Sequence, residues 1–338
     1  MNLNLLWFIL LGVLLTGYAI LDGFDLGVGV LHLAVRKDEE RRIFMNSIGP
    51  LWDGNEVWLV TFGGAMFAAF PEVYATVFSG FYTPFMALLF ALIFRAVSME
   101  FRGKREGKVW RQFWDISFFT GSTLATFLYG VAVGNAMTGM PIGADKLFYG
   151  TTLDLVRPYP VLVGFLALAT FAMHGSLYLY LKTEGDLQRK LQHWAWRTFG
   201  FFLIAYLFTT MITLVEVPLA TRNFSEHPWI WGVVGLNILA VSNIPRAIYK
   251  NRPGYAFLSS CATIAALTFF FGVALFPDLV YSSLNPAWSL TVYNGASSAK
   301  TLAIMRNIAF MGLPFVLAYS AAISWVFRGK VKLGHFSY

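Results

Sequence analysis

The first 21 residues of the chain, MNLNLLWFILLGVLLTGYAIL, contain no charged side chain. Long apolar stretches of this kind recur along the sequence, and they limit the possible folds more than any other feature does. Each such stretch is long enough, at about 1.5 Å per helical residue, to cross about 30 Å of hydrocarbon. Because hydrocarbon cannot satisfy an open backbone, the expected spanning structure is the helix. The sequence predicts an all-α integral membrane protein whose nine transmembrane helices cover about residues 5–33, 53–70, 75–98, 115–137, 159–181, 198–219, 229–247, 255–276 and 303–327.

The composition supports a membrane protein. Charged residues make up only 13% of the chain, about half the share found in soluble domains. A net charge of +7 would suit nucleic acid, but the basic residues lie in short clusters between apolar stretches, as topology signals do. The single cysteine, Cys261, excludes a disulfide or a cysteine-based metal site within the chain.

The basic residues also predict the orientation. Most of the 25 lysines and arginines fall after the first, third, fifth and seventh predicted helices, and in the C-terminal tail. An error of one helix would destroy this alternation, so it supports nine crossings. The positive-inside rule then puts the N-terminus outside and the C-terminus in the cytoplasm. We expect one polytopic membrane domain over residues 1–338, because no soluble linker or repeat divides the chain.

Ionisable side chains inside the predicted helices are few, and most of them share one region. They fall in the predicted cytoplasmic half of the first four helices. Charged groups at membrane depth are costly and often mark ion or proton paths. The residues concerned are Asp22, Asp25, Asp53, Glu56, Arg95, Glu100 and Asp115.

The spacing of four of these acids points to proton chemistry. Asp22 and Asp25 are three residues apart, as are Asp53 and Glu56, so each pair shares a helix face. Two close carboxylates repel each other, which raises the affinity of one for a proton. Arg95 could compensate one charge, and the remaining acids are candidates to carry protons.

Structural roles remain open at this stage for the same residues. Asp53 and Glu56 fit the D-x-x-E pattern of a capping box at a helix start. Glycines spaced for close helix packing also occur, at Gly23 with Gly27 and at Gly63 with Gly64. Purely structural polar contacts or headgroup positions are alternatives for Asp22, Arg95, Glu100 and Asp115.

The sequence offers little for catalysis by this chain alone. Of five histidines, only His174 lies clearly within a predicted span, whereas bis-histidine haem ligation needs two facing imidazoles. No nucleotide-binding, metallohydrolase or nucleophile-elbow motif occurs in a usable context. We therefore expect neither a metal site nor a catalytic residue within the chain.

Three motifs in the N-terminal region resemble a known family. They are LDGFDLGVG at 21–29, NSIGP at 46–50 and WDGNEVWL at 52–59. Together they resemble subunit II of cytochrome bd-type quinol oxidases. The likeness is dense over about residues 18–135, and beyond that it is mainly one of span number and length.

This resemblance implies a fold and a set of partners. The fold would be two four-helix bundles plus one peripheral helix, with the N-terminal bundle at about 1–137 and the remainder at about 138–338. The main partner would be subunit I, in a heterodimer, carrying two haem b groups, one haem d and the quinol site. A small single-span accessory subunit, lipids and a bound quinone are further implied partners, in the cytoplasmic membrane of a bacterium or archaeon.

The resemblance also implies a function. The complex would oxidise quinol and reduce oxygen to water, separating charge without pumping. Asp53 would lie on a path for protons from the cytoplasm toward haem d, with Trp52 as its packing neighbour. Asp25, Asp22 and Glu56 would continue this path, and Asn55, Arg95, Glu100 and Asp115 would support it. The competing hypotheses are a proton-coupled secondary transporter and a purely scaffolding membrane subunit.

Overall fold

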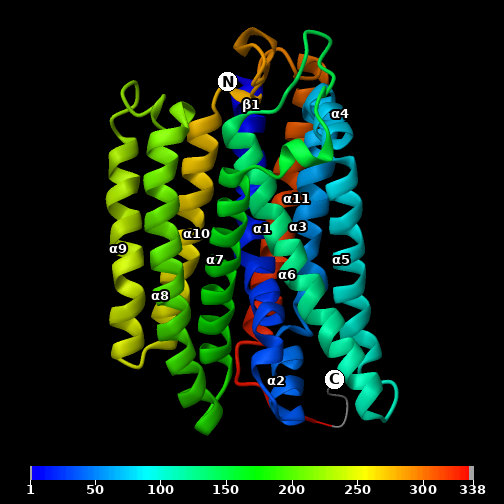
Figure 1. The fold of residues 1–338 in the computed structure, drawn as a ribbon, viewed down its shortest axis with the longest axis vertical. Helices are drawn as coiled ribbons and strands as arrows, with labels where there is room; N and C mark the ends of the chain where they lie inside the picture. Colours follow the sequence, from blue (N-terminus) through cyan, green and yellow to red (C-terminus); the bar gives the residue numbers. More distant parts are fainter. Residues whose placement is uncertain (1, 335–338) are drawn as a thin grey trace.

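The computed structural model describes residues 2–334, and its long helices run side by side along the molecule (Figure 1). These helices are α1 (Leu3–Leu31), α3 (Trp52–Ala69), α5 (Tyr82–Phe101), α6 (Lys108–Thr138), α7 (Pro158–Lys182), α8 (Gly185–Glu216), α9 (Ile230–Tyr249), α10 (Pro253–Leu275) and α11 (Ala299–Val326). The shorter elements are α2 (Asp38–Ile48), α4 (Pro71–Gly80), η1 (His32–Ala34), η2 (Thr152–Leu155), η3 (Pro218–Thr221), η4 (Pro286–Trp288) and two strands, β1 (Asp278–Val280) and β2 (Leu290–Thr291).

The predicted all-α membrane fold is confirmed in its class. Eight helices of the described chain are long and apolar enough to cross a membrane. The shorter helix α3, which begins with the polar residues of the WDGNEVW stretch, is not one of the eight. The count of nine crossings therefore stays a prediction.

One helix that was predicted to be continuous is broken in the structure. The stretch at about 75–98 is divided between α4 and α5, with Phe81 as the joint. Pro84 has no N–H to donate to the carbonyl of Gly80, so the helical ladder is interrupted there. The apolar character of the stretch hid this break.

Helices α1 and α7 pack against each other at the centre of the molecule, where their backbones come close together. A Cβ atom added at Gly27 would lie 1.9 Å from the carbonyl oxygen of Phe171, and one at Gly23 would lie 3.0 Å from the Phe171 ring. Small residues permit this approach, as is common between helices in membranes. Helices α8, α9 and α10 lie on one side of this pair, and α3 and α5 lie on the other (Figure 1).

Gly63 and Gly64 differ from Gly23 and Gly27 in their surroundings. Among residues 2–334, no atom lies within 4 Å of a Cβ added at either position. Within the described chain these two glycines therefore face no neighbouring helix, and their packing role stays a prediction. The neighbouring Val60 and Phe67 are exposed on the same helix.

The two ends of the helix bundle differ in chemistry. At one end, which we call the basic end, α1 finishes, α3 begins and the tail after α11 lies (bottom of Figure 1). At the other end, the connections 139–157 and 276–298 fold over the helices. Met140 bridges them through backbone hydrogen bonds, donating to Tyr281 and accepting from Ser283.

Candidate functional site

Four charged side chains from three helices meet inside the N-terminal half of the molecule. Arg95 on α5 donates to Asp22 of α1 (Nη2 to Oδ1, 2.7 Å) and to Glu56 of α3 (Nη1 to Oε1, 2.6 Å). Arg95 and Asp22 are fully buried, whereas the Glu56 side chain keeps 26% of its surface. We call these residues together with Asp25 the carboxylate cluster.

Asp25 belongs to this cluster but has a neutral partner. The amide nitrogen of Asn55 donates to Asp25 Oδ2 at 2.7 Å and to the carbonyl oxygen of Leu21 at 3.3 Å. Asp25 is fully buried and forms no ion pair within residues 2–334. Its Oδ1 atom and the Oδ2 atom of Asp22 have no hydrogen-bond partner in the described chain.

The charges of the cluster do not balance. Three carboxyl groups face one guanidinium, so full ionisation would leave two negative charges in excess. Burial penalises uncompensated charge strongly, and close carboxylates repel each other. One proton shared among the acids removes part of that cost. The arrangement is suited to taking up and releasing a proton.

Two tyrosines extend the polar interior, and sequence analysis missed both. The Tyr18 hydroxyl donates to the Tyr129 hydroxyl at 2.7 Å, between α1 and α6. Tyr18 lies four residues before Asp22, so the two share a face of α1. That spacing was the available signal for Tyr18, whereas the position of Tyr129 depends on how α6 packs.

Asp53 and Trp52 lie at the rim of the cluster. Helix α3 begins at Trp52, and its N-cap residue Leu51 makes no side-chain capping bond. The capping-box alternative is therefore wrong, since Glu56 bonds Arg95 instead of the helix start. Asp53 is exposed in the first turn of α3, and Trp52 is half-buried.

Asp115 forms a second ionic cluster at the basic end. Its carboxylate accepts hydrogen bonds from His32 (Nε2, 2.6 Å), Arg41 (Nη1, 2.8 Å) and Arg102 (Nε, 2.6 Å). Asp115 is almost completely buried among these partners, so its carboxylate does not face lipid. Through His32, Arg41 and Arg102, these hydrogen bonds hold η1, α2 and the end of α5 against α6. Glu100, by contrast, is exposed.

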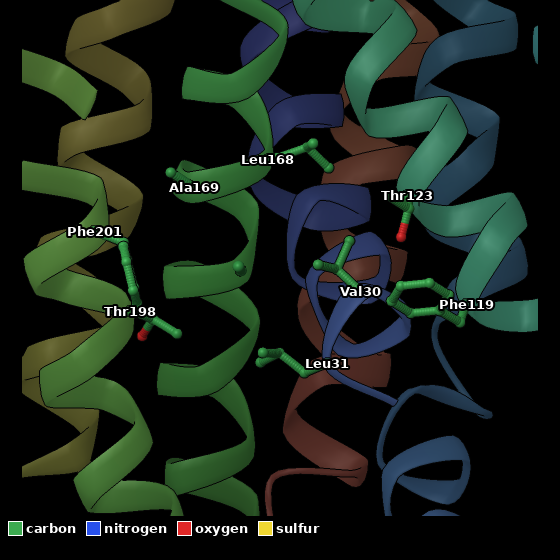
Figure 2. Close-up of a pocket in the computed structure, with 9 residues that line it drawn as sticks. Val30, Leu31, Phe119, Thr123, Leu168, Ala169, Thr198 and Phe201 are labelled. Carbon is green, nitrogen blue, oxygen red and sulfur yellow. The ribbon is translucent and has the colours of Figure 1, made fainter. Parts of the chain in front are cut away.

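A groove on the outside of the molecule has a different character. It encloses about 370 Å³ between α1, α6, α7 and α8, and Figure 2 shows aliphatic and aromatic side chains around it. Thr123 and Thr198 supply the polar side chains of its lining. With no charged group in the lining, this groove suits a hydrocarbon chain better than a proton or an ion.

The two histidines buried in the bundle already have hydrogen-bond partners. Both ring nitrogens of the buried His174 are engaged, Nδ1 with Ser260 Oγ at 2.7 Å and Nε2 with the carbonyl oxygen of Ile20 at 3.0 Å. His32 is bound to Asp115 through Nε2, and its Nδ1 has no partner within residues 2–334. Within residues 2–334, no group of three or more histidine, cysteine, aspartate or glutamate residues could hold a metal ion.

Comparison with known proteins decides the family. The family model for "Cytochrome bd terminal oxidase subunit II" matches residues 3–327. The chain belongs to the cytochrome bd oxidase subunit II family. The resemblance predicted from the N-terminal motifs is thereby confirmed, and it extends over nearly the whole sequence.

Individual relatives of this subunit II are similar along their full length. The Bacillus subtilis protein "Cytochrome bd ubiquinol oxidase subunit 2" is 37% identical over 335 residues, covering 98% of this chain and 97% of the relative. "Cytochrome bd-I ubiquinol oxidase subunit 2" of Escherichia coli K12 is 34% identical over 360 residues, covering 97% and 95%. The chain is thus a multi-pass bacterial membrane protein and a subunit of an oxidoreductase complex, and the transporter hypothesis is not favoured.

The fold of this subunit II also has a solved counterpart. A chain of "The structure of bd oxidase from Geobacillus thermodenitrificans" superposes with a TM-score of 0.78. It is 17% identical in sequence, and the match covers 97% of this chain and 99% of that one. The likeness supports the helical architecture, and membership of the family implies a subunit I partner.

Proposed function

We propose that this chain supports a haem-bearing subunit I in oxidising quinol and reducing oxygen to water, and that it supplies part of a proton-uptake path. The observation that carries the proposal is the carboxylate cluster, in which Asp22 and Glu56 share one buried guanidinium and Asp25 is held by the Asn55 amide. Haem, two of type b and one of type d, would lie in subunit I and supply the electron transfer to oxygen. The present chain would hold and move protons without binding haem or catalysing on its own.

Each acid has a distinct place in this path. Asp53, exposed at the start of α3, would receive protons from water at the basic end. Glu56 lies one helical turn further on and is partly exposed, so it would connect Asp53 to the buried acids. Asp22 and Asp25 would hold the proton inside. Arg95 would lower the cost of the negative charges and stay positive throughout.

The membrane arrangement is part of the same proposal. Nine crossings would include α3 together with the eight apolar helices, in two bundles at about 1–137 and 138–338 within one membrane domain, α11 being the peripheral helix. The basic end would face the cytoplasm of a bacterial inner membrane. Protons consumed at haem d would then come from the cytoplasm, and turnover would separate charge without a pump.

The outer surface offers places for the remaining partners. The exposed apolar side chains of α3 and α5, among them Val60, Phe67 and Phe90, lie beside the outward-facing Gly63 and Gly64. This face would dock subunit I, because small residues let a neighbouring helix approach closely. A lipid chain or the tail of a quinone would occupy the apolar groove of Figure 2. A small single-span accessory subunit would find room on the remaining apolar surface.

The test is the substitution Asp25→Asn in the purified two-subunit complex. It keeps the shape of the side chain and the contact with Asn55 but removes a proton carrier. We expect oxygen consumption with quinol to fall by about 100-fold, in the range that a lost proton-transfer group costs. The haem absorption spectrum should stay unchanged. Asp53→Asn should give a smaller loss, since water can partly replace an exposed carrier.

The matched control is Asp186→Asn, an exposed acid at the start of α8 in the other bundle. It should leave turnover unchanged. If Asp25→Asn and Asp53→Asn retain full turnover with an intact haem spectrum, the chain is a scaffold and the proton path lies elsewhere.

A further inference from the structure

The apolar groove of Figure 2 has large side chains along its two sides and small ones between them. Thr198 and Phe201 of α8 lie on one side and Phe119 of α6 lies on the other, with Ala169 of α7 between (Figure 2). Ala172, one turn further along α7, also lines the groove. Its volume of about 370 Å³ falls in the range of about 300–1,000 Å³ that is typical of ligand pockets. The groove is therefore large enough to hold part of an apolar ligand.

This groove extends toward the basic end of the bundle. Its lining includes Leu31, the last residue of α1, which finishes at that end. Helix α8 starts there, so Arg197 lies nearer to the basic end than Phe201 does. The two residues are four apart and share a face of α8. Because helical side chains lean toward the helix N-terminus, the exposed Arg197 extends from the groove toward the basic end.

The start of α2 lies beside this mouth of the groove. Asp38, the first residue of α2, accepts a hydrogen bond from Arg111 of α6 (Nη1, 3.2 Å). Glu40 accepts one from Lys190 of α8 (Nζ, 2.8 Å). These two ion pairs hold the first turn of α2 between the helices that form the two sides of the groove. The two residues that precede α2 therefore lie at the mouth as well.

Cations at the mouth outnumber acids. Arg36 and Lys37, which precede α2, and Arg197 of α8 are exposed, and none of the three forms an ion pair within residues 2–334. Of the three acids in the first turn of α2, only Glu39 is unpaired in the described chain. Three unpaired cations and one unpaired acid leave an excess of two positive charges. An anion would find complementary charge at this position.

We infer that the groove is a binding site for an anionic phospholipid. The phosphate would pair with Arg197 and with the two basic residues before α2, while an acyl chain would lie between Phe119 and Phe201. A guanidinium binds phosphate through paired hydrogen bonds, and basic segments at a membrane surface attract anionic lipids. The inference rests on the membrane arrangement of the proposed function, in which the basic end meets the membrane surface.

Charge complementarity distinguishes this occupant from other apolar molecules. A quinone tail could fill the apolar part of the groove, but an uncharged quinone would leave the three cations without a partner. A zwitterionic lipid carries its own cation next to the phosphate, which weakens the attraction to Arg197. An anionic headgroup with an acyl chain matches both the charged mouth and the apolar lining.

The test uses photoreactive lipids on the purified two-subunit complex. A phosphatidylglycerol and a phosphatidylcholine, each with a diazirine on one acyl chain, are added at equal concentration, and the labelled peptides are identified by mass spectrometry. We expect phosphatidylglycerol to label residues 168–172 and 198–201 and to do so more strongly than phosphatidylcholine. Equal labelling of these residues by the two lipids would overturn the inference.

Removing one cation tests the headgroup contact. Arg197→Gln should raise the phosphatidylglycerol concentration needed for half-maximal labelling about fivefold, the usual effect of one basic group near an anionic surface. The matched control is Lys250→Gln, because Lys250 is exposed beyond the end of α9 and forms no ion pair in the described chain. Equal shifts in the two variants would show that only the overall charge matters, and the site would be disproved.

Filling the groove tests the position of the acyl chain. Ala169→Leu should lower labelling at 198–201 with the haem spectrum intact, whereas Ala322→Leu on α11, which is exposed and outside the groove, should leave it unchanged. A long-tailed quinone at a concentration equal to that of the lipid should not displace the phosphatidylglycerol label. Displacement by the quinone would make the groove a site for a quinone tail and overturn the inference.

The fate of the proton path is read separately. If Asp25→Asn stops turnover while the two lipids label the groove equally, only the lipid site is wrong. If phosphatidylglycerol labels the groove selectively while Asp25→Asn keeps full turnover, the lipid site stands and the proton path is wrong.

Discussion

The two halves of the molecule bury polar side chains in opposite ways. In the N-terminal half, α1, α3 and α5 bring together three acids and one arginine. In the C-terminal half, helices α7 to α10 are joined by neutral pairs, such as His174 with Ser260 at 2.7 Å and Asn237 with Tyr206 at 2.8 Å. The ion pair of Arg222 with Asp278 lies beyond these helices, at the end of the bundle opposite the basic end. The neutral pairs hold helices in register. The carboxylate cluster holds more acids than cations, and under the proposed function this excess makes it responsive to protons.

The largest effect should come from removing the one cation of the carboxylate cluster. Arg95→Met leaves Asp22 and Glu56 without their ion-pair partner in the interior. Breaking a buried pair in this way costs about 3–5 kcal/mol. We expect the complex to assemble in low yield and to unfold at a much lower temperature in detergent. Adding Asp22→Asn and Glu56→Gln should restore most of the stability, because the uncompensated charges are then gone; failure of this rescue would contradict the charge argument.

A smaller effect should follow from disturbing the seam between the two halves. Gly27→Ala puts a methyl group against the backbone of α7, where only 1.9 Å is available to the Phe171 carbonyl oxygen. Such overpacking costs about 1–3 kcal/mol. Thermal unfolding of the purified complex should report the loss. The control on the same helix is Gly12→Ala, since no described atom lies within 4 Å of a Cβ there; comparable losses for both glycines would contradict the close packing of α1 on α7.

The smallest effect should come from the neutral pairs. Ser260→Ala removes the partner of His174 Nδ1 and should cost about 1 kcal/mol of stability, the usual worth of one hydrogen bond. Because this pair lies outside the carboxylate cluster, oxygen consumption should stay within the experimental error of the unmodified complex. A large loss of turnover in Ser260→Ala at full haem content would remove the contrast between the two halves.

Much of the fold follows from the sequence, because the apolar stretches and basic clusters act locally. Most helix ends agree with the predicted ranges, but α6 begins at Lys108 and α8 at Gly185, well before the predicted 115 and 198. At Phe81, a stretch that looks uniform is broken because Pro84 lacks an N–H. Asp22, Glu56 and Arg95 were predicted as a group, since their depth in the membrane follows from their position along each helix.

What the sequence could not supply is the lateral arrangement of the helices. The depth of a residue does not say which neighbour its side chain faces. Asn55 reaches Asp25, and Tyr129 reaches Tyr18, only because α3 and α6 pack on particular faces of α1. Gly63 and Gly64 have the same small side chains as Gly23 and Gly27 but turn outward, for the same reason.

The tethered position of α11 has a consequence for how the molecule is made. Domains and bundles form progressively from the N-terminus during synthesis, so Asp25 and Asn55 are in the membrane long before residues 299–326 leave the ribosome. A chain cut short before α11 would thus insert its other apolar helices and lack the contacts that hold this last helix, from Trp7 to the Leu302 carbonyl and from Lys182 to the Phe327 carbonyl.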